Sequence, residues 1–125
     1  MVYLWVGAAG FLGACLRYII GVLLYDVDVY FPYSTLSVNL IGSFLLAWFT
    51  FELVHKYAVS PALKAAIGTG FVGSFTTFST LSVETVALFE RGSFLLGLLY
   101  VAVSIVGGLL FSRLGYSIGK RRGTV

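Results

Sequence analysis

Four long apolar stretches, separated by short polar connections, constrain this chain more than any other feature. They run from about residue 2 to 25, 34 to 54, 61 to 89 and 94 to 118. A helix needs about 20 mostly apolar residues to cross a bilayer, and each stretch reaches that length. The connections leave no room for a separate soluble domain. The sequence therefore predicts an all-α membrane protein: a single domain over residues 1–125, with four transmembrane helices.

The composition supports a membrane protein. Hydrophobic residues make up 59% of the chain and charged residues only 10%, whereas soluble domains carry about 25% charged residues. The net charge of +3 comes with no broad basic patch, so we expect the lipid bilayer as a partner and no nucleic acid. The single cysteine, Cys15, has no partner for an internal disulfide and belongs to no metal-ligand cluster.

Local signals mark the ends of the stretches. The first ends at an acidic loop over residues 26–28. Ser60 followed by Pro61 predicts an N-cap with proline at the first helical position. Glu90, Arg91 and Gly92 should end the third stretch. We expect the fourth to stop at about residue 118, before a basic tail.

The basic residues are distributed unevenly between the two ends of the helices. With four crossings, both termini and the middle connection lie on one side of the membrane. That side carries five basic residues, Lys56, Arg113, Lys120, Arg121 and Arg122, and the other side carries Arg91. Cytoplasmic loops are enriched in Lys and Arg, so we expect both termini in the cytoplasm, with the chain in the cell membrane.

The third stretch contains the unusual segment GFVGSFTTFSTLSVE, residues 70–84. It has two glycines, six hydroxyl side chains and a carboxylate within an apolar region. Gly70 and Gly73 weaken regular helix, and a break there frees backbone groups that must be satisfied. Freed carbonyls suit a cation, while the next half-helix points its positive N-terminus toward an anion. Small residues also permit tight packing without a break, so both interpretations stay open.

Three side chains are polar at membrane depth. Arg17 either extends to an interface or lines a watery vestibule that attracts an anion. Asn39 either bonds across to another helix or offers a donor to an anion in a pore. Glu84 follows Thr76 and Thr80 at a spacing of four, which predicts one polar stripe. Its carboxylate is either functional or paired with Arg17 or a backbone group.

Regular spacing also recurs in the outer stretches. In the fourth, Tyr100, Ser104 and Gly108 share a face, which is either a polar track or a serine bonded to its own helix backbone. Glycines at every third position of the first stretch permit close approach of another helix: Gly7, Gly10 and Gly13.

Taken together, these motifs resemble the CrcB/Fluc family of fluoride channels. GAAGFLGACLRY in the first stretch is similar to the family's glycine-rich run that ends in arginine and an aromatic residue. STLSVNLIGSFLL in the second is similar to its Thr-Leu-x-x-Asn-Leu-x-Gly pattern. GFVGSFTTFST with a downstream glutamate is the most specific match. The resemblance covers essentially the whole chain.

The resemblance implies a passive, fluoride-selective channel that exports cytoplasmic fluoride and relieves fluoride toxicity. It implies an antiparallel, dual-topology dimer with two pores and a structural Na⁺ at its centre, held by the backbone carbonyls of Gly73 and Thr76. The residues it assigns to the fluoride path are Asn39, Phe78, Ser79, Thr80, Ser104 and Arg17. Glu84 would have a structural or gating role.

The chain departs from the family pattern at three positions. Leu81 stands where the family usually has a second phenylalanine and has no ring edge to offer an anion. Gly108 replaces a common serine, and Ser74 replaces the second glycine of a pair. The uneven basic charge also disfavours one chain inserted in both orientations. The partner is therefore either a second copy or a paralogous chain of opposite topology.

Other classes fit less well. A small dimeric proton-coupled multidrug exporter needs a carboxylate within its first helix, where this chain has Arg17. A non-conducting membrane subunit stays open because of Leu81. We expect no enzymatic activity, because no metal-ligand cluster, nucleophile–base pair or cofactor motif occurs.

Overall fold

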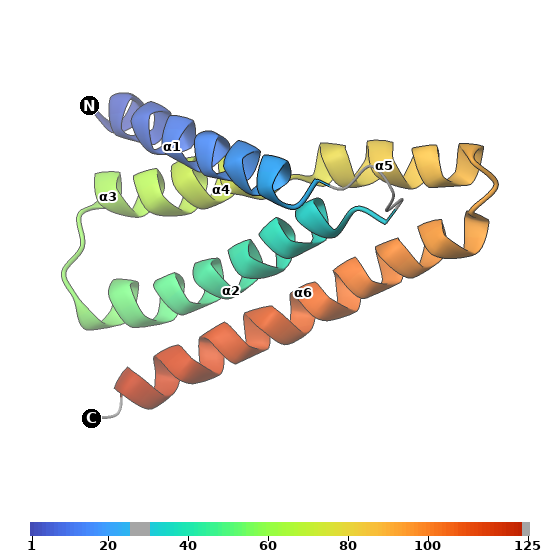
Figure 1. Cartoon of the computed structure of the whole chain (residues 1–125). Coiled ribbons are helices and arrows are strands. Elements are labelled where there is room, and N and C mark those ends of the chain that lie inside the picture. The colour runs from blue at the N-terminus through green and yellow to red at the C-terminus, as the bar shows by residue number, and fades with distance from the viewer. Residues whose placement is uncertain (26–30, 124–125) are drawn as a thin grey trace.

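The computed structural model describes residues 1–25 and 31–123, and the chain is helical throughout these ranges apart from its connections (Figure 1). The elements are α1 (Val2–Leu23), α2 (Tyr33–Lys56), α3 (Pro61–Ala65), the π-helix η1 (Ala66–Val72), α4 (Gly73–Phe75), α5 (Phe78–Glu90) and α6 (Phe94–Gly123). By length and composition, α1, α2 and α6 are each able to cross a membrane. These findings agree with the predicted all-α membrane protein.

The third apolar stretch forms a broken helix. α3, η1 and α4 follow one another over residues 61–75, and α5 begins at Phe78. Between them, Thr76 (φ −83°, ψ 159°) and Thr77 (φ −152°, ψ 122°) are extended. Gly73, where we expected the break to begin, keeps helical angles (φ −61°, ψ −36°). Extended backbone suits β-branched threonine, so the break lies at the two threonines and not at the glycine.

Most helix ends follow the local signals. Ser60 Oγ accepts a hydrogen bond from Leu63 N at 3.2 Å, with Pro61 at the first helical position, as predicted. α5 ends at Glu90, and Gly92 reverses the chain with a φ of 80°, where glycine carries no steric penalty. The predicted acidic loop at residues 26–28 lies outside the described residues.

The last helix extends past the predicted fourth apolar stretch. α6 continues to Gly123, beyond the expected end near residue 118. Lys and Arg are good helix formers, and their cations interact favourably with the negative C-terminal end of a helix. A basic sequence such as that at residues 120–122 therefore extends a helix.

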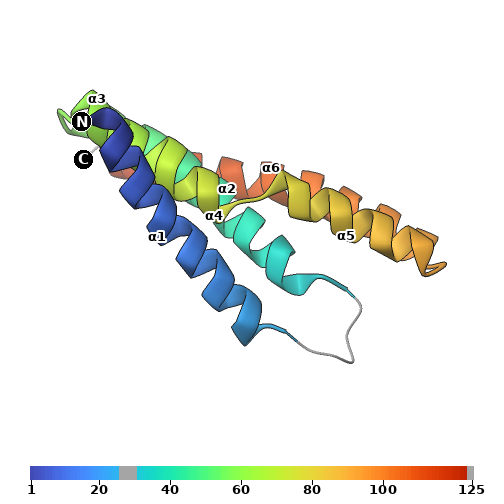
Figure 2. The ribbon, with the colours of Figure 1, turned by 90° about the horizontal axis from the view of Figure 1, so that it is seen from above.

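The two halves of the broken helix pack on different partners. α2 and α6 lie side by side along most of their length (Figure 1). η1 and α4 pack against α1, whereas α5 packs against α6 and extends away from α1 (Figure 2). The break therefore lies where the chain passes from one packing unit to the other.

Close helix contacts depend on glycine. A Cβ at Gly13 would collide with Phe71 O and Ser74 Oγ, so α1 reaches the broken helix through this position. A Cβ at Gly7 would meet nothing within 4 Å. The predicted glycine-mediated approach is therefore present at Gly13, and the outer part of the glycine series takes no part in it.

Both chain ends lie at the same end of the molecule. In Figures 1 and 2, the start of α1 and the end of α6 lie at the same end of the molecule as α3, and the turn between α5 and α6 lies at the opposite end. Many large apolar side chains on α1 and α6 point outward, including Leu4, Leu12 and Leu109, as expected of a surface that faces hydrocarbon.

Candidate functional site

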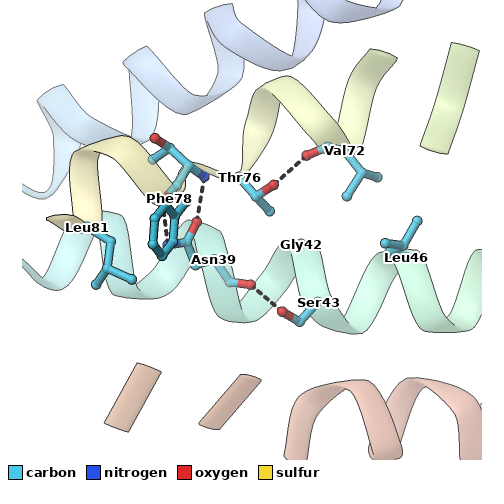
Figure 3. A pocket seen from close by; sticks show the side chains of 9 residues that line it. Asn39, Gly42, Ser43, Leu46, Val72, Thr76, Phe78 and Leu81 are labelled. Atoms are coloured by element: carbon cyan, nitrogen blue, oxygen red, sulfur yellow. Dashed lines mark hydrogen bonds between the residues drawn. The ribbon is translucent and has the colours of Figure 1, made fainter. Parts of the chain in front are cut away.

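The side chain of Asn39 forms the hydrogen bonds that the backbone lacks at the helix break. Its Nδ2 donates to Thr77 O at 3.0 Å, and Thr77 N donates to its Oδ1 at 2.8 Å (Figure 3). A carboxamide carries both a donor and an acceptor, so this one side chain satisfies both backbone groups of Thr77. Asn39 therefore makes the interhelical contact that was one of its two predicted roles. One Nδ2 hydrogen has no partner among the described residues.

The same contacts leave two backbone carbonyls without their usual donors. In an uninterrupted helix, Thr77 N would donate to Gly73 O, and Thr80 N would donate to Thr76 O. Here Thr77 N donates to Asn39 Oδ1, and Thr80 N donates to Thr77 Oγ1 at 3.2 Å. The C-terminal end of a half-helix and unwound carbonyls suit an alkali cation. Gly73 and Thr76 thus fit the Na⁺ that the motif resemblance implies.

A cavity of about 280 Å³ lies beside the break. Its wall includes Asn39, Thr76, Thr77, Phe78 and Leu81. Phe78 and Leu81 stand on the α5 side of this cavity, next to Asn39 (Figure 3). The position where the chain departs from the family pattern therefore lies in the same wall as the predicted anion donor.

Hydroxyl groups gather at the N-terminus of α5. Thr77 Oγ1 donates to Thr80 Oγ1 at 3.1 Å and lies 3.3 Å from Ser79 Oγ. Ser79 is exposed, and the ring of Phe78 is 80% exposed on the single chain. The N-terminal end of a helix carries a partial positive charge. This end of α5 therefore combines that charge with hydroxyls and an aromatic ring at the edge of the cavity.

Glu84 is bound by hydroxyls from two other helices. Thr35 Oγ1 on α2 donates to Glu84 Oε1 at 2.6 Å, and Tyr100 OH on α6 donates to Oε2 at 3.4 Å. Thr35 is buried, and Tyr100 is completely buried with its ring edge-on to Phe31. The alternative that paired Glu84 with Arg17 was wrong within the described residues, because two hydroxyls take that place.

A comparison with protein families identifies the chain. The family model described as "CrcB-like protein, Camphor Resistance (CrcB)" matches residues 4–116. The chain belongs to this family. The resemblance inferred from the motifs is thereby confirmed.

Curated relatives of this CrcB-like chain are named as fluoride channels. It is 56% identical over 108 residues to the fluoride-specific ion channel FluC 1 of Desulfitobacterium hafniense (strain Y51), covering 86% of this chain and 94% of the relative. It is 52% identical over 121 residues to FluC 2 of Geobacillus kaustophilus (strain HTA426), covering 96% and 94%. The identity to FluC 2 of Listeria innocua serovar 6a is 45% over 115 residues. The family consists of ion channels, and the prediction that the chain is not an enzyme is confirmed.

Two further residues with predicted roles lie apart from the break. Ser104 Oγ donates to Tyr100 O at 2.7 Å within α6, which is the backbone contact that was one of its two predicted states. Arg17 is half-buried on α1 and is not part of the cavity wall beside the break. The predicted stripe of Thr76, Thr80 and Glu84 is divided, because Thr76 lies in the break itself and the other two share α5.

Sequence reasoning missed two residues of this CrcB-like site. Thr77 caps α5 and meets Asn39, and its signal was a hydroxyl residue three positions before Thr80 at the start of a helix. Thr35 donates to Glu84, but only the tertiary structure brings these residues together. A threonine in an apolar helix carries no local sign of such a partner.

Proposed function

We propose that the chain is a fluoride-selective passive ion channel that exports cytoplasmic fluoride across the cell membrane and relieves fluoride toxicity. The curated relatives, named fluoride-specific ion channels, match the chain over most of its length. The observation that carries the proposal is the helix break. It places the Asn39 amide, the Phe78 ring and the N-terminal end of α5 around one cavity.

Four crossings follow from adding the broken helix to α1, α2 and α6. Residues 61–90 would extend about 45 Å as a helix, more than the roughly 30 Å of hydrocarbon. Irregular backbone at membrane depth is tolerated where it is covered by protein or lines a watery cavity. In the single chain, Phe78 beside the break is largely exposed, which supports a second, antiparallel subunit over this face. The uneven distribution of basic residues supports a cytoplasmic location for both termini of this chain.

Fluoride would lose water as it moves through the channel, and polar groups along the path would replace that water. Asn39 offers its remaining Nδ2 hydrogen, and Phe78 offers the positive edge of its ring. Further groups along the path would be the hydroxyls of Ser79, Thr80 and Ser104, with Arg17 attracting the anion at a vestibule. Glu84, held by Thr35 and Tyr100, would have a structural or gating role.

The carbonyls of Gly73 and Thr76 would hold a structural Na⁺ at the centre of the dimer. The support is that Asn39 and Thr77 engage the N–H groups that would otherwise bond these carbonyls. When bound, the ion would supply positive charge between the two broken helices. It would not drive transport.

A heterodimer is the second candidate, and Leu81 is the observation that favours it. Leu81 lines the same cavity as Asn39 and Phe78 but lacks a ring to present to an anion. The uneven basic charge favours one fixed orientation, so a paralogous chain of opposite topology would complete the channel. Nothing in the relatives' names supports the multidrug-exporter alternative.

Fluoride efflux from liposomes tests the proposal. The purified chain is reconstituted into liposomes loaded with potassium fluoride, valinomycin is added, and a fluoride electrode records release. We expect rapid efflux for the parent and at least a tenfold slower rate, about 1.4 kcal/mol, for Phe78→Ile. Phe11→Ile is the matched control, because Phe11 is exposed on α1 away from the cavity. Equal efflux from Phe78→Ile and the control would contradict the assigned path.

A further inference from the structure

Asn39 lines the proposed anion site and bonds Thr77, the residue that follows the proposed cation ligand Thr76. Its amide lines the cavity assigned to the anion, and the same amide holds both backbone groups of Thr77. Thr77 N–H is the group that a regular helix would direct to Gly73 O. One side chain therefore borders the proposed anion cavity and accepts the N–H that a regular helix would direct to a proposed cation ligand.

Without Asn39, the N–H of Thr77 would need another acceptor. An unpaired N–H is costly at membrane depth, and water is scarce there. Gly73 O, four residues earlier, is the acceptor in helical register, and Gly73 already has helical angles. α4 is only one turn long and ends at Phe75, so the new bond would extend it across the break. Gly73 O would then be occupied by Thr77 N–H.

We propose that Asn39 is a positioning residue for the Na⁺ site: by accepting Thr77 N–H it keeps the Gly73 carbonyl free for the cation. This inference rests on the proposed function, because it takes Gly73 and Thr76 as the cation ligands. It adds that a side chain of α2 sets the cation affinity of the break between α4 and α5. Loss of Asn39 then weakens Na⁺ binding as well as fluoride conduction.

Thr77 performs the equivalent task for the second carbonyl. Its Oγ1 accepts Thr80 N–H at 3.2 Å, which leaves Thr76 O without a helical donor. The side chain of Thr76 bonds back to Val72 O at 2.9 Å, so it does not compete for this N–H. Each proposed cation ligand thus depends on a different side-chain acceptor, and Asn39 serves Gly73.

Two substitutions at Asn39 separate its acceptor from its donors. Asn39→Asp keeps a side-chain oxygen for Thr77 N–H and replaces the Nδ2 donor. Asn39→Leu has a similar size and removes the acceptor and the donors together. Ser43→Ala is the matched control, because Ser43 lines the same cavity while its hydroxyl donates only to Asn39 O on its own helix, at 2.8 Å.

The test measures Na⁺ binding without conduction. The thermal unfolding midpoint of each purified protein is recorded in detergent against Na⁺ concentration, with N-methylglucamine as the replacement cation. A ligand that binds only the folded state raises the midpoint with its concentration. We expect Asn39→Leu to need about tenfold more Na⁺ than the parent for the same rise in the midpoint. This is the size of effect expected from losing one hydrogen bond, here the bond from Thr77 N to Asn39 Oδ1. Asn39→Asp and Ser43→Ala should need no more Na⁺ than the parent.

The outcomes distinguish this inference from the proposed function. If Asn39→Leu keeps the Na⁺ dependence of the parent but loses fluoride efflux, Asn39 acts only in the pore and the inference is overturned. A parent midpoint insensitive to Na⁺ overturns it as well. If the parent binds Na⁺ as expected but releases no fluoride, the channel proposal fails and the inference stands. Should Asn39→Leu not fold, Asn39→Ser replaces it with the same expectation, because the shorter side chain does not reach Thr77 N.

Discussion

Asn39 and Thr77, 38 residues apart in the sequence, exchange two hydrogen bonds between a side-chain amide and a backbone peptide group. Asn39 on α2 thereby supplies the hydrogen-bond donor and acceptor that the backbone of Thr77 lacks at the break. The pairing lets extended backbone exist inside an apolar fold without an unpaired N–H or C=O at Thr77. The first half of the broken helix packs on α1, and the second half packs on α6.

The cap of α5 should be measurable as stability. Thr77→Val removes the Oγ1 that accepts Thr80 N–H and should lower the free energy of unfolding by about 1 kcal/mol. Chemical unfolding of the purified protein in detergent provides the measurement. Thr69→Val is the control, since Thr69 is exposed in η1 and forms no hydrogen bond through its side chain within the described residues. Equal stability of the two variants would contradict the capping role.

Two glycines of α1 should respond differently to the same change. Gly13→Ala forces a methyl group against Phe71 O and Ser74 Oγ, and overpacking of this kind costs about 1–3 kcal/mol. Gly7→Ala meets open space and should be neutral or stabilising by up to about 1 kcal/mol, because alanine favours helix. Unfolding midpoints of the two variants decide the matter. A Gly13→Ala protein as stable as Gly7→Ala would show that α1 does not pack closely on the broken helix.

The two hydroxyls on Glu84 should contribute unequally. The bond from Thr35 is 2.6 Å long and the bond from Tyr100 is 3.4 Å. Short hydrogen bonds to a charged group contribute about 1.5–3 kcal/mol, so Thr35→Val should destabilise the protein by about 2 kcal/mol. Tyr100→Phe should cost less than about 1 kcal/mol, because a bond at the distance limit is weak. Unfolding in detergent at neutral pH tests the order, and the reverse order would contradict the geometry around Glu84.

Leu81→Phe should improve the anion path. A ring at this position would add a positive edge to the cavity wall shared with Asn39 and Phe78. An aromatic contact contributes about 0.5–1.5 kcal/mol, so fluoride efflux from liposomes containing this chain alone should rise by about twofold to thirteenfold. The control is Leu109→Phe, which places the same ring on an exposed face of α6. If both variants behave like the parent, residue 81 does not limit the path.

Local features were predictable where the chemistry is local. The start of α3 at Ser60 and Pro61 and the turn at Gly92 depend on neighbouring residues, so their signals are visible in the sequence. The break was expected between Gly73 and Thr76, and it lies at the end of that range, at Thr76 and Thr77. The position of the break depends on Asn39 from another helix, and the local sequence around the break does not reveal that partner.

The sequence motifs named candidate site residues but not the contacts that those residues make. The motif identified Asn39, Phe78 and Glu84, and the structure adds what each one touches. Glu84 meets hydroxyls of Thr35 and Tyr100 because α2 and α6 converge on α5, and helix packing decides such a convergence. Contacts between residues far apart in the sequence could not be predicted from composition or residue spacing.

Ion selectivity is the central claim, and one measurement tests it most directly. Liposomes that contain only the purified chain are loaded with fluoride or with chloride, and the release of each anion is followed with the matching electrode after valinomycin is added. We predict fast fluoride efflux and chloride release no faster than from protein-free liposomes. Equal release of the two anions would contradict fluoride selectivity, and no fluoride release from the chain alone would contradict the homodimeric channel.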